Sequence, residues 1–498
     1  MKRMTIFAIA AVLSVFVSSP VLASYISDIG YTALKNELSA ATPTGTGIKV
    51  TQVEAPINDV SGGAAPIFMP DPTAAGFVSK SITAINGNPS GNFSGHATGV
   101  GQLFYGNAGS IAPGVTQIDS DEANAWLNSL SAASGRATTR SDRVANHSWV
   151  GGGDDGSQDG RILRIVDRQV ALNEYIQVVG LSNGNGTSPW LGSAYNVISV
   201  GRTDAVHQQG TVPVGGDALY GAGRIRPDIV APLSTTSEAT PVVSAAATLL
   251  VQTGHEGGLA ISEGSTTIAG VGSLYNAERS ETVKAALMAG ADRQTANTSI
   301  TADIADYRSA GHETVNGLDD RFGAGQINIY NSHRILAGGE QKSVQSGGVD
   351  ISAFGFDHGT IGSLNGTGNT ASYFFNAASE ATLFASLVWN LAVSNDARLT
   401  ATLYNLDLSL FDVTHNSLVT TSASLVDNTE NIYYKVLLGT RYELRVTTKE
   451  PTDFSLDYAL AWRLDASPSP VPIPATAWLF AAGMMSFLAL ARRQSAPR

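Results

Sequence analysis

The stretch Thr236-Ser237-Glu238-Ala239-Thr240-Pro241, with the small and apolar residues 242–250 behind it, decides the fold predicted for this chain. The apolar run predicts a buried helix, and a proline is tolerated in its first turn. The hydroxyl of Ser237 would then lie at a helix N-terminus, where free N–H groups and the helix dipole favour negative charge. A serine there is suited to act as a nucleophile, although a serine that merely caps the helix fits the same residues.

A histidine segment precedes it in the chain: Ser94-Gly95-His96-Ala97-Thr98-Gly99-Val100-Gly101. These small residues predict a helix that begins close to His96. A serine nucleophile needs a base such as histidine within hydrogen-bond reach. Since a lone histidine is more often structural, only its combination with Ser237 indicates catalysis.

Five segments in the same order resemble the subtilisin-like serine peptidases, the subtilases. They are residues 95–100, 197–201, 226–232, 236–241 and 321–325. The resemblance implies a subtilase catalytic domain over residues 45–338, with an acid, a histidine and a serine in that chain order. It implies a serine endopeptidase that acts on proteins or peptides.

The acid position departs from the family pattern, because Glu54 stands where the family has aspartate after its strand. A glutamate could hold the imidazole tautomer if the backbone retracts slightly, so Glu54 is the predicted orienting acid for His96. Asp59 is a distant second candidate. The alternative function is a catalytically inactive surface or binding protein on the same scaffold.

The resemblance also implies an oxyanion donor and a strand that pairs with substrate. In residues 178–186 the pair Gly184-Asn185 points to Asn185 as the donor, with Asn183 as the fallback. Residues 146–151 resemble the substrate strand, and His147 and Trp149 would flank the cleft, although Trp149 could equally be core. The predicted substrate-binding residues are Ser148, Trp149, Val150 and Gly151.

Short strand-like runs alternate with helical stretches up to residue 338, which favours an α/β fold, a three-layer sandwich with a mainly parallel sheet. Strict alternation in residues 406–410 and 441–447 predicts an antiparallel β-sandwich domain over residues 347–464. This second domain resembles the pre-peptidase C-terminal domains of secreted proteases. Its role in binding or spacing is not specified by the sequence.

Both ends of the chain predict targeting. Lys2, Arg3, an apolar run and Val21-Leu22-Ala23 are typical of a secretory signal peptide over residues 1–23. Residues 466–498 combine a Pro-rich linker, a short apolar segment (475–491) for the membrane and an arginine tail. They resemble the PEP-CTERM sorting signal in its VPLPA-type variant.

That resemblance implies envelope sorting machinery as a partner and a place in the envelope, on the surface or outside a Gram-negative bacterium. A permanent single-span anchor, with its arginines on the cytoplasmic side, is the alternative.

The composition of the chain argues against several other functions and kinds of site. The 498 residues hold 30 Lys and Arg against 42 Asp and Glu, a net charge of −12, so nucleic-acid binding is not expected. Cysteine is absent, which excludes disulfides and thiolate chemistry. No metal ligands or cofactor are predicted, although the acidic, glycine-rich residues 154–160 could hold calcium.

Overall fold

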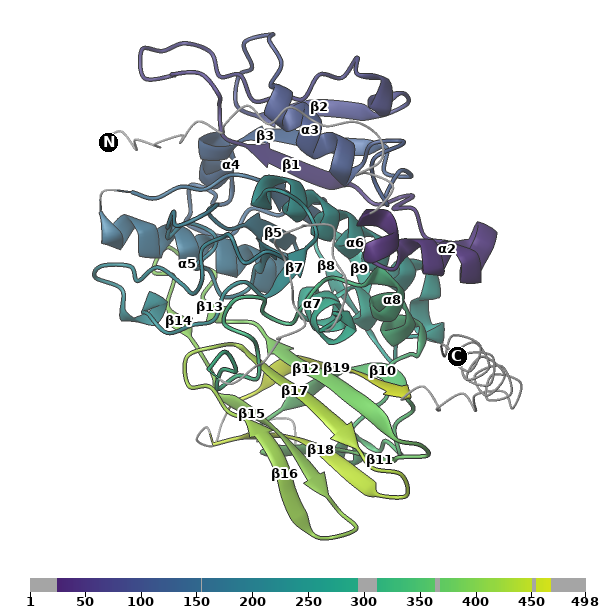
Figure 1. The fold of residues 1–498 in the computed structure, drawn as a ribbon. Helices are drawn as coiled ribbons and strands as arrows, with labels where there is room; N and C mark the ends of the chain where they lie inside the picture. The colour runs from purple at the N-terminus through teal and green to yellow at the C-terminus, as the bar shows by residue number, and fades with distance from the viewer. Residues whose placement is uncertain (1–24, 154, 294–310, 363–367, 450–453, 467–498) are drawn as a thin grey trace, which may run out of the picture.

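The computed structural model describes residues 25–153, 155–293, 311–362, 368–449 and 454–466 (Figure 1). The predicted signal peptide (1–23) and, apart from Ala466, the predicted sorting signal (466–498) lie outside these residues. Within them, no helix combines the length and the apolar character needed to cross a membrane.

The first part of the chain is built on a seven-stranded, fully parallel sheet in the order β2-β3-β1-β4-β5-β6-β7. Its strands are β1 (Val50–Glu54), β2 (Ser81–Asn86), β3 (Gln117–Glu122), β4 (Val144–His147), β5 (Ile176–Gly180), β6 (Ile198–Arg202) and β7 (Ile229–Ala231). Strands β1, β4, β5 and β7 are buried along their whole length, as expected for a parallel sheet covered on both faces.

Helices cover the two faces and complete the three layers. They are α2 (Tyr31–Leu38), α3 (Gly95–Phe104), α4 (Ala123–Ser129), α5 (Gly156–Asn173), α6 (Thr236–Gly257), α7 (Ser280–Gly290) and α8 (Ile329–Ala337). Helices α3, α6, α7 and α8 share one apolar core with one face of the sheet. Helices α4 and α5 share a second core with the other face. A small hairpin, β8 (Ser265–Ile268) and β9 (Gly272–Tyr275), lies beside α6.

The second part is a β-sandwich of two antiparallel four-stranded sheets, β10-β19-β12-β17 and β11-β18-β15-β16. Its strands are β10 (Phe354–Ile361), β11 (Thr370–Asn376), β12 (Ala381–Trp389), β15 (Leu406–Asp412), β16 (Ser417–Ser422), β17 (Thr429–Val436), β18 (Arg441–Thr448) and β19 (Leu456–Ala466). The short pair β13 (Ala392–Val393) and β14 (Ala401–Thr402) follows β12. Figure 1 shows the sandwich below the α/β part.

The predicted fold class is confirmed in both parts. The apolar run after Pro241 forms α6, which is buried through most of its length because it packs on four strands of the sheet. The alternating residues 406–410 and 441–447 lie in β15 and β18, which pair antiparallel and turn alternate side chains into the sandwich core. The exact domain boundaries stay predictions.

Candidate active site

The predicted acid and base lie in contact at the edge of the sheet. Glu54 is the last residue of β1, and His96 is the second residue of α3. Nδ1 of His96 lies 2.9 Å from Oε2 of Glu54, and the His96 side chain is 25% exposed while that of Glu54 is buried. Asp59, the second candidate acid, is exposed and accepts a hydrogen bond of 2.8 Å from the N–H of Ser61.

A glutamine that the sequence analysis did not single out holds the other oxygen of the acid. The side-chain amide of Gln52 donates 2.8 Å hydrogen bonds to Oε1 of Glu54 and to the carbonyl of Ala97. Its own oxygen accepts a hydrogen bond of 2.5 Å from the hydroxyl of Tyr105. Gln52 thus connects β1 to α3 by hydrogen bonds. Because it binds Oε1 of Glu54, Oε2 can interact with His96.

The charge around His96 favours its protonated form. The attraction of Glu54 raises the pKa of His96, burial opposes this, and the hydrogen bond with Glu54 and the charge of Glu238 raise it further. Glu238 follows Ser237 directly in the first turn of α6, so this last contribution comes from the helix that bears Ser237.

Ser237 lies in that first turn, which is closed by a reciprocal cap. Thr235 accepts from the N–H of Glu238 at 3.2 Å, and the Glu238 carboxylate accepts from the N–H of Thr235 at 3.1 Å. The Ser237 hydroxyl donates to the carbonyl of Ser148 over 3.4 Å, and the Ser148 hydroxyl donates back to the Ser237 carbonyl over 3.1 Å. In the described part of the chain, no hydrogen bond joins Ser237 to His96.

Helices α3 and α6 both begin at one edge of the sheet. Helices α3 and α6 pack against each other, and each enters from a loop at the carboxyl edge of the parallel strands. In open α/β sheets this is the edge at which ligands bind. The fold brings the predicted serine, histidine and acid to this edge.

The two candidate oxyanion donors, Asn183 and Asn185, lie in the turn after β5. Oδ1 of Asn183 accepts a hydrogen bond of 3.0 Å from the N–H of Thr236 at the start of α6, and both Asn183 and Asn185 are exposed. Asn183 thus contacts, through its side-chain oxygen, the residue that precedes Ser237. Of the two candidates, Asn183 is the one that contacts the start of α6, while the choice of the oxyanion donor stays a prediction.

Beyond β4, the predicted substrate strand presents backbone rather than aromatic side chains. Ser148 and Trp149 are buried, and Trp149 belongs to the core under α4 and α5. Val150 is half-buried, and Gly151 bonds to Ser188 through both its N–H and its carbonyl. The expectation that the Trp149 side chain flanks a cleft is not met, because this side chain faces the core.

His147, the other residue expected beside the cleft, is also buried. Its Nε2 lies 3.0 Å from Oε1 of Gln177, and burial lowers the pKa of His147 to about 3. A neutral, buried imidazole of this kind packs beside Trp126 and serves the core.

Within the acidic segment 154–160, helix α5 begins at Gly156. Asp155 caps this helix by accepting from the N–H of Ser157 at 2.9 Å, and Asp159 accepts from the N–H of Gly153 at 2.8 Å and from the indole of Trp190. Asp154 lies outside the described residues. Among those described, no cluster of three or more His, Asp or Glu side chains could hold a metal ion.

No protein-family model matches the chain, and no curated protein matches it. Among solved structures, the prenylagaramide maturation protease PagA is 18% identical over 61% of this chain and 99% of its own, with a TM-score of 0.37. A protease of Pseudoalteromonas arctica is 14% identical over 61% of this chain and 94% of its own, with a TM-score of 0.36.

For the sandwich, the pre-peptidase C-terminal domain of a Bacillus anthracis collagenase covers 22% of this chain and 87% of its own, at 17% identity and a TM-score of 0.17. At such identities and TM-scores, the likeness says nothing about activity. What the site can do follows from its own geometry.

Proposed function

We propose that this chain is a serine endopeptidase in which Ser237 is the nucleophile, His96 the general base and Glu54 the orienting acid. The observation that carries the proposal is the 2.9 Å contact of Glu54 with His96 Nδ1, at the edge of the sheet where α6, the helix that bears Ser237, also begins. An acid, an imidazole and a hydroxyl in this arrangement are the recurring parts of acyl-transfer sites.

Glu54 sets the tautomer of the base. When Nδ1 of His96 donates to Glu54, Nε2 keeps its lone pair and can accept the proton of Ser237. The same carboxylate stabilises the imidazolium that forms, as the raised pKa of His96 indicates. A glutamate can do this here because Gln52 fixes its second oxygen.

The reaction then proceeds in two steps. Oγ of Ser237 attacks the scissile carbonyl carbon while its proton passes to Nε2 of His96. The C–N bond breaks as His96 returns that proton to the leaving amine. Water, deprotonated by His96, attacks the acyl ester, and the acid product leaves as Ser237 regains its proton.

The Ser237 hydroxyl must first turn away from the Ser148 carbonyl. At 3.4 Å that hydrogen bond is long and weak. Catalytic hydrogen bonds often tighten only when substrate is bound. The N–H of Ser237 and the amide of Asn183 would donate to the oxyanion beside the positive end of α6.

The substrate class follows from the backbone beyond β4. Neither Val150 nor Gly152 makes a backbone hydrogen bond to the described residues. An extended peptide could add to this segment as a further strand, with main-chain hydrogen bonds that do not depend on its sequence. This supports a protein or peptide as the substrate.

We also propose that the chain is exported and sorted to the envelope. The support is the sequence at both ends: a signal peptide ending at Ala23, and an apolar segment (475–491) followed by Arg492-Arg493. Sequencing both ends of the protein recovered from the producing cells tests this, because export predicts an N-terminus at Ser24. An intact signal peptide in the recovered protein would contradict it.

A fluorophosphonate probe tests the catalytic proposal, because it forms a covalent bond only with an activated serine. We expect labelling of the wild type, which is lost in Ser237→Ala and in His96→Ala. Ser234→Ala, an exposed serine three residues upstream, is the matched control and should label normally. No labelling of correctly folded wild type would favour a non-catalytic binding protein on this scaffold.

A further inference from the structure

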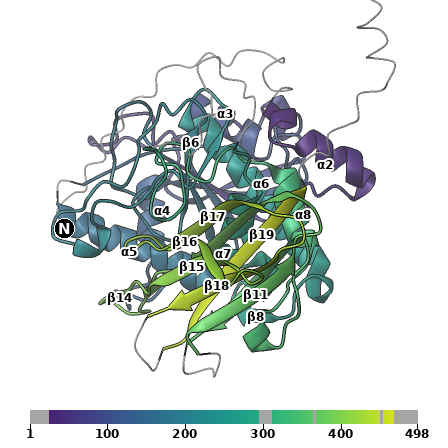
Figure 2. The same cartoon turned by 60° about the horizontal axis from the view of Figure 1, so that its bottom comes forward.

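The β-sandwich shares its core with the α/β part. The sheet β10-β19-β12-β17 packs on α7, and Figure 2 shows this helix behind the strands. Four sandwich residues belong to the same buried apolar cluster as α6 and α7, namely Phe356, Val388, Ala459 and Ala461. Continuous burial of this kind is typical of one folding unit rather than of two domains joined by a linker.

Residues of the sandwich also contact both ends of α7. At the C-terminal end, the buried guanidinium of Arg463 donates 2.9 Å hydrogen bonds to the carbonyls of Ala289 and Ala291. Carbonyls at a helix C-terminus lack partners within the helix and attract a cation. At the N-terminal end, His358 lies 2.8 Å from the carboxylate of Glu281.

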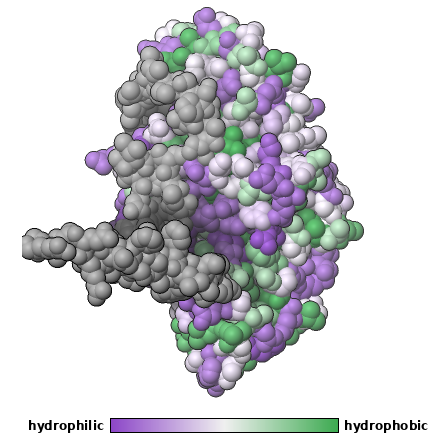
Figure 3. Space-filling model, turned by 45° about the vertical axis from the view of Figure 1, so that its right-hand side comes forward, coloured by the Kyte–Doolittle hydropathy of each residue, from purple (hydrophilic) through white to green (hydrophobic). Residues whose placement is uncertain are grey.

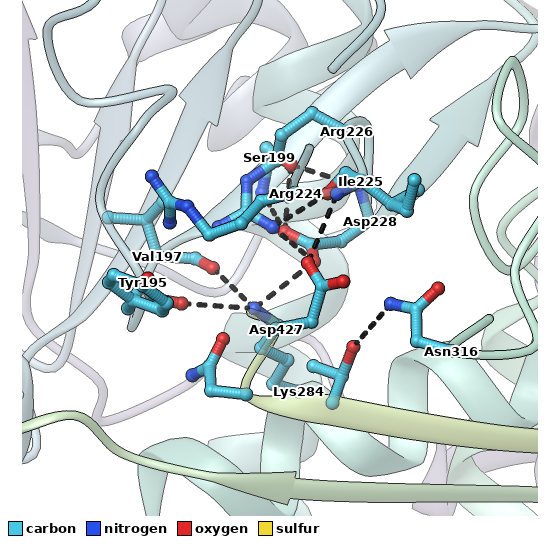
Figure 4. A network of polar contacts seen from close by, with 12 residues as sticks. Tyr195, Val197, Ser199, Arg224, Ile225, Arg226, Asp228, Lys284, Asn316 and Asp427 are labelled. Carbon is cyan, nitrogen blue, oxygen red and sulfur yellow. Dashed lines mark hydrogen bonds and ion pairs between the residues drawn. The ribbon is translucent and has the colours of Figure 1, made fainter. Parts of the chain in front are cut away.

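A third contact joins the sandwich to a buried network of charged side chains in the α/β part (Figure 4). The loop between β16 and β17 brings Asp427 to the N–H of Ile225, which donates to it over 3.0 Å. The neighbouring buried charges of the α/β part are Arg224, Arg226, Lys284, Asp167 and Asp228.

Asp427 adds a negative charge of the sandwich to this network. It lies near the buried guanidinium groups of Arg226 and Arg224, which belong to the α/β part. Burial raises the pKa of Asp427, while Arg226 and the hydrogen bond from Ile225 lower it. Without Asp427, the buried guanidinium of Arg226 would lose one of its nearby negative charges, which is costly at low dielectric.

The segment that Asp427 holds leads directly to the proposed nucleophile. Asp228 accepts from both the N–H and the hydroxyl of Ser199, at 2.7 and 2.8 Å, and it lies 3.2 Å from Nζ of Lys284. The chain then forms β7 (Ile229–Ala231) and reaches Ser237 six residues later. A shift of this segment would therefore be transmitted to the start of α6.

We propose that the β-sandwich is a permanent part of the catalytic unit, and that Asp427 is a positioning residue for the segment leading to Ser237. The sandwich is then not a detachable binding module. The rim of the contact is polar, as the ion pair of Lys342 with Glu263 at 2.9 Å illustrates. Hydrophilic residues gather at mid-height on the face shown in Figure 3. Only the effect on Ser237 rests on the proposed function; the permanence of the contact does not.

Cutting the connection between the two parts tests permanence without any activity. Gly347 is exposed, and a side chain added there would meet nothing within 4 Å, so a cleavage sequence for a site-specific peptidase can be inserted at this point. The Ser237→Ala background prevents self-digestion. We expect the two fragments to co-elute in gel filtration after the cut, at micromolar concentration and in 0.5 M salt, conditions chosen to screen surface charges. Fragments that separate while remaining folded would overturn the proposal.

Asp427→Asn tests the positioning role in the full-length chain, because asparagine keeps an oxygen for Ile225 but removes the charge. We expect a lower midpoint of thermal unfolding and, at a temperature where the variant is fully folded, fluorophosphonate labelling about tenfold slower than in the wild type. Asp350→Asn removes a carboxylate from an exposed pair with Arg441 and should change neither quantity.

The two measurements separate the two claims. Wild-type labelling rates in folded Asp427→Asn would overturn the positioning role. If the wild type itself does not label, the proposed peptidase activity fails. Co-elution and the shift in the unfolding midpoint would then still decide whether the sandwich is permanent.

Discussion

The side-chain amide of Gln52 lies 2.8 Å from Oε1 of Glu54. The two residues are two positions apart on the same strand, and the buried glutamine fixes the carboxylate that contacts His96. Residues two apart on a strand point to the same face, which is why this pair can form at all. The acid is thus held on both oxygens, by Gln52 on one and by His96 on the other.

Replacing Gln52 by methionine keeps its size and removes its hydrogen bonds. Oε1 of Glu54, the carbonyl of Ala97 and the hydroxyl of Tyr105 would lose their partner. We expect the free energy of unfolding to fall by about 2–4 kcal/mol, since buried unpaired polar groups cost about 1–3 kcal/mol each. Because Glu54 is then free to turn, kcat should fall about tenfold with little change in KM.

Denaturant unfolding and peptide hydrolysis measure the two effects. Gln102→Met is the matched control, because Gln102 is a half-buried glutamine of α3. This variant should preserve both the free energy of unfolding and kcat. An unchanged kcat in Gln52→Met would show that Glu54 does not need this support.

Shortening or neutralising Glu54 should have graded effects on the rate of fluorophosphonate labelling. Glu54→Gln keeps the shape but removes the charge that stabilises imidazolium, so we expect a loss of about 10⁴-fold, as for the acid of a Ser-His-Asp triad. Glu54→Asp keeps the charge but withdraws it by one methylene from the 2.9 Å contact with His96, so we expect a loss of about 10- to 100-fold. Equal rates in both variants and the wild type would exclude Glu54 from the mechanism.

The sequence predicted the elements of the site better than the contacts between them. The small-residue helix after His96 and the apolar run after Pro241 are local patterns, and both formed as expected. The role of Gln52 depends on Tyr105 and Ala97, which are brought to it by the packing of α3 against β1. No local pattern encodes that approach.

The choice between Asn183 and Asn185 depends on a contact of the same kind. Gly184 between them has a positive φ of 62°, so the turn reverses direction within one residue and sends the two side chains to different places. Matching the Gly-Asn pair to the family pattern selected Asn185, whereas the backbone brings Asn183 to Thr236.

A signal for the shared core was present in the sequence. The run Tyr458-Ala459-Leu460-Ala461-Trp462 is continuously apolar, although a sandwich strand with one solvated face should alternate. In the structure both faces of β19 are buried along this run, one in the sandwich core and the other against the α/β part. Small alanines face α7 because that helix approaches closely.

Asn183 and Asn185 can be separated by their effect on turnover. Asn183→Asp keeps Oδ1 for the N–H of Thr236, 3.0 Å away, but removes the amide donors. We expect kcat for a peptide substrate to fall by about 10²–10³ with little change in KM, the usual cost of losing one oxyanion donor. Asn185→Ala should behave as the wild type. The reverse result would return the donor role to Asn185.

The acid limb of the pH profile should report the charge next to the nucleophile. Activity requires neutral His96, so it rises as the pH passes the pKa of His96, which Glu54 and Glu238 hold above its ordinary value of 6.5. Glu238→Gln removes one of these negative charges, while its amide oxygen can still accept from Thr235 and preserve the cap. We therefore expect the acid limb to move to lower pH by about half a unit.

Fluorophosphonate labelling rates between pH 5 and 8 measure this shift in both proteins. Glu256→Gln, exposed in the last turn of the same helix, has the same change of charge far from His96 and should leave the limb in place. A limb that stays in place or moves to higher pH in Glu238→Gln would mean that Glu238 does not act on His96. The carboxylate of Glu238 would then serve only to cap α6.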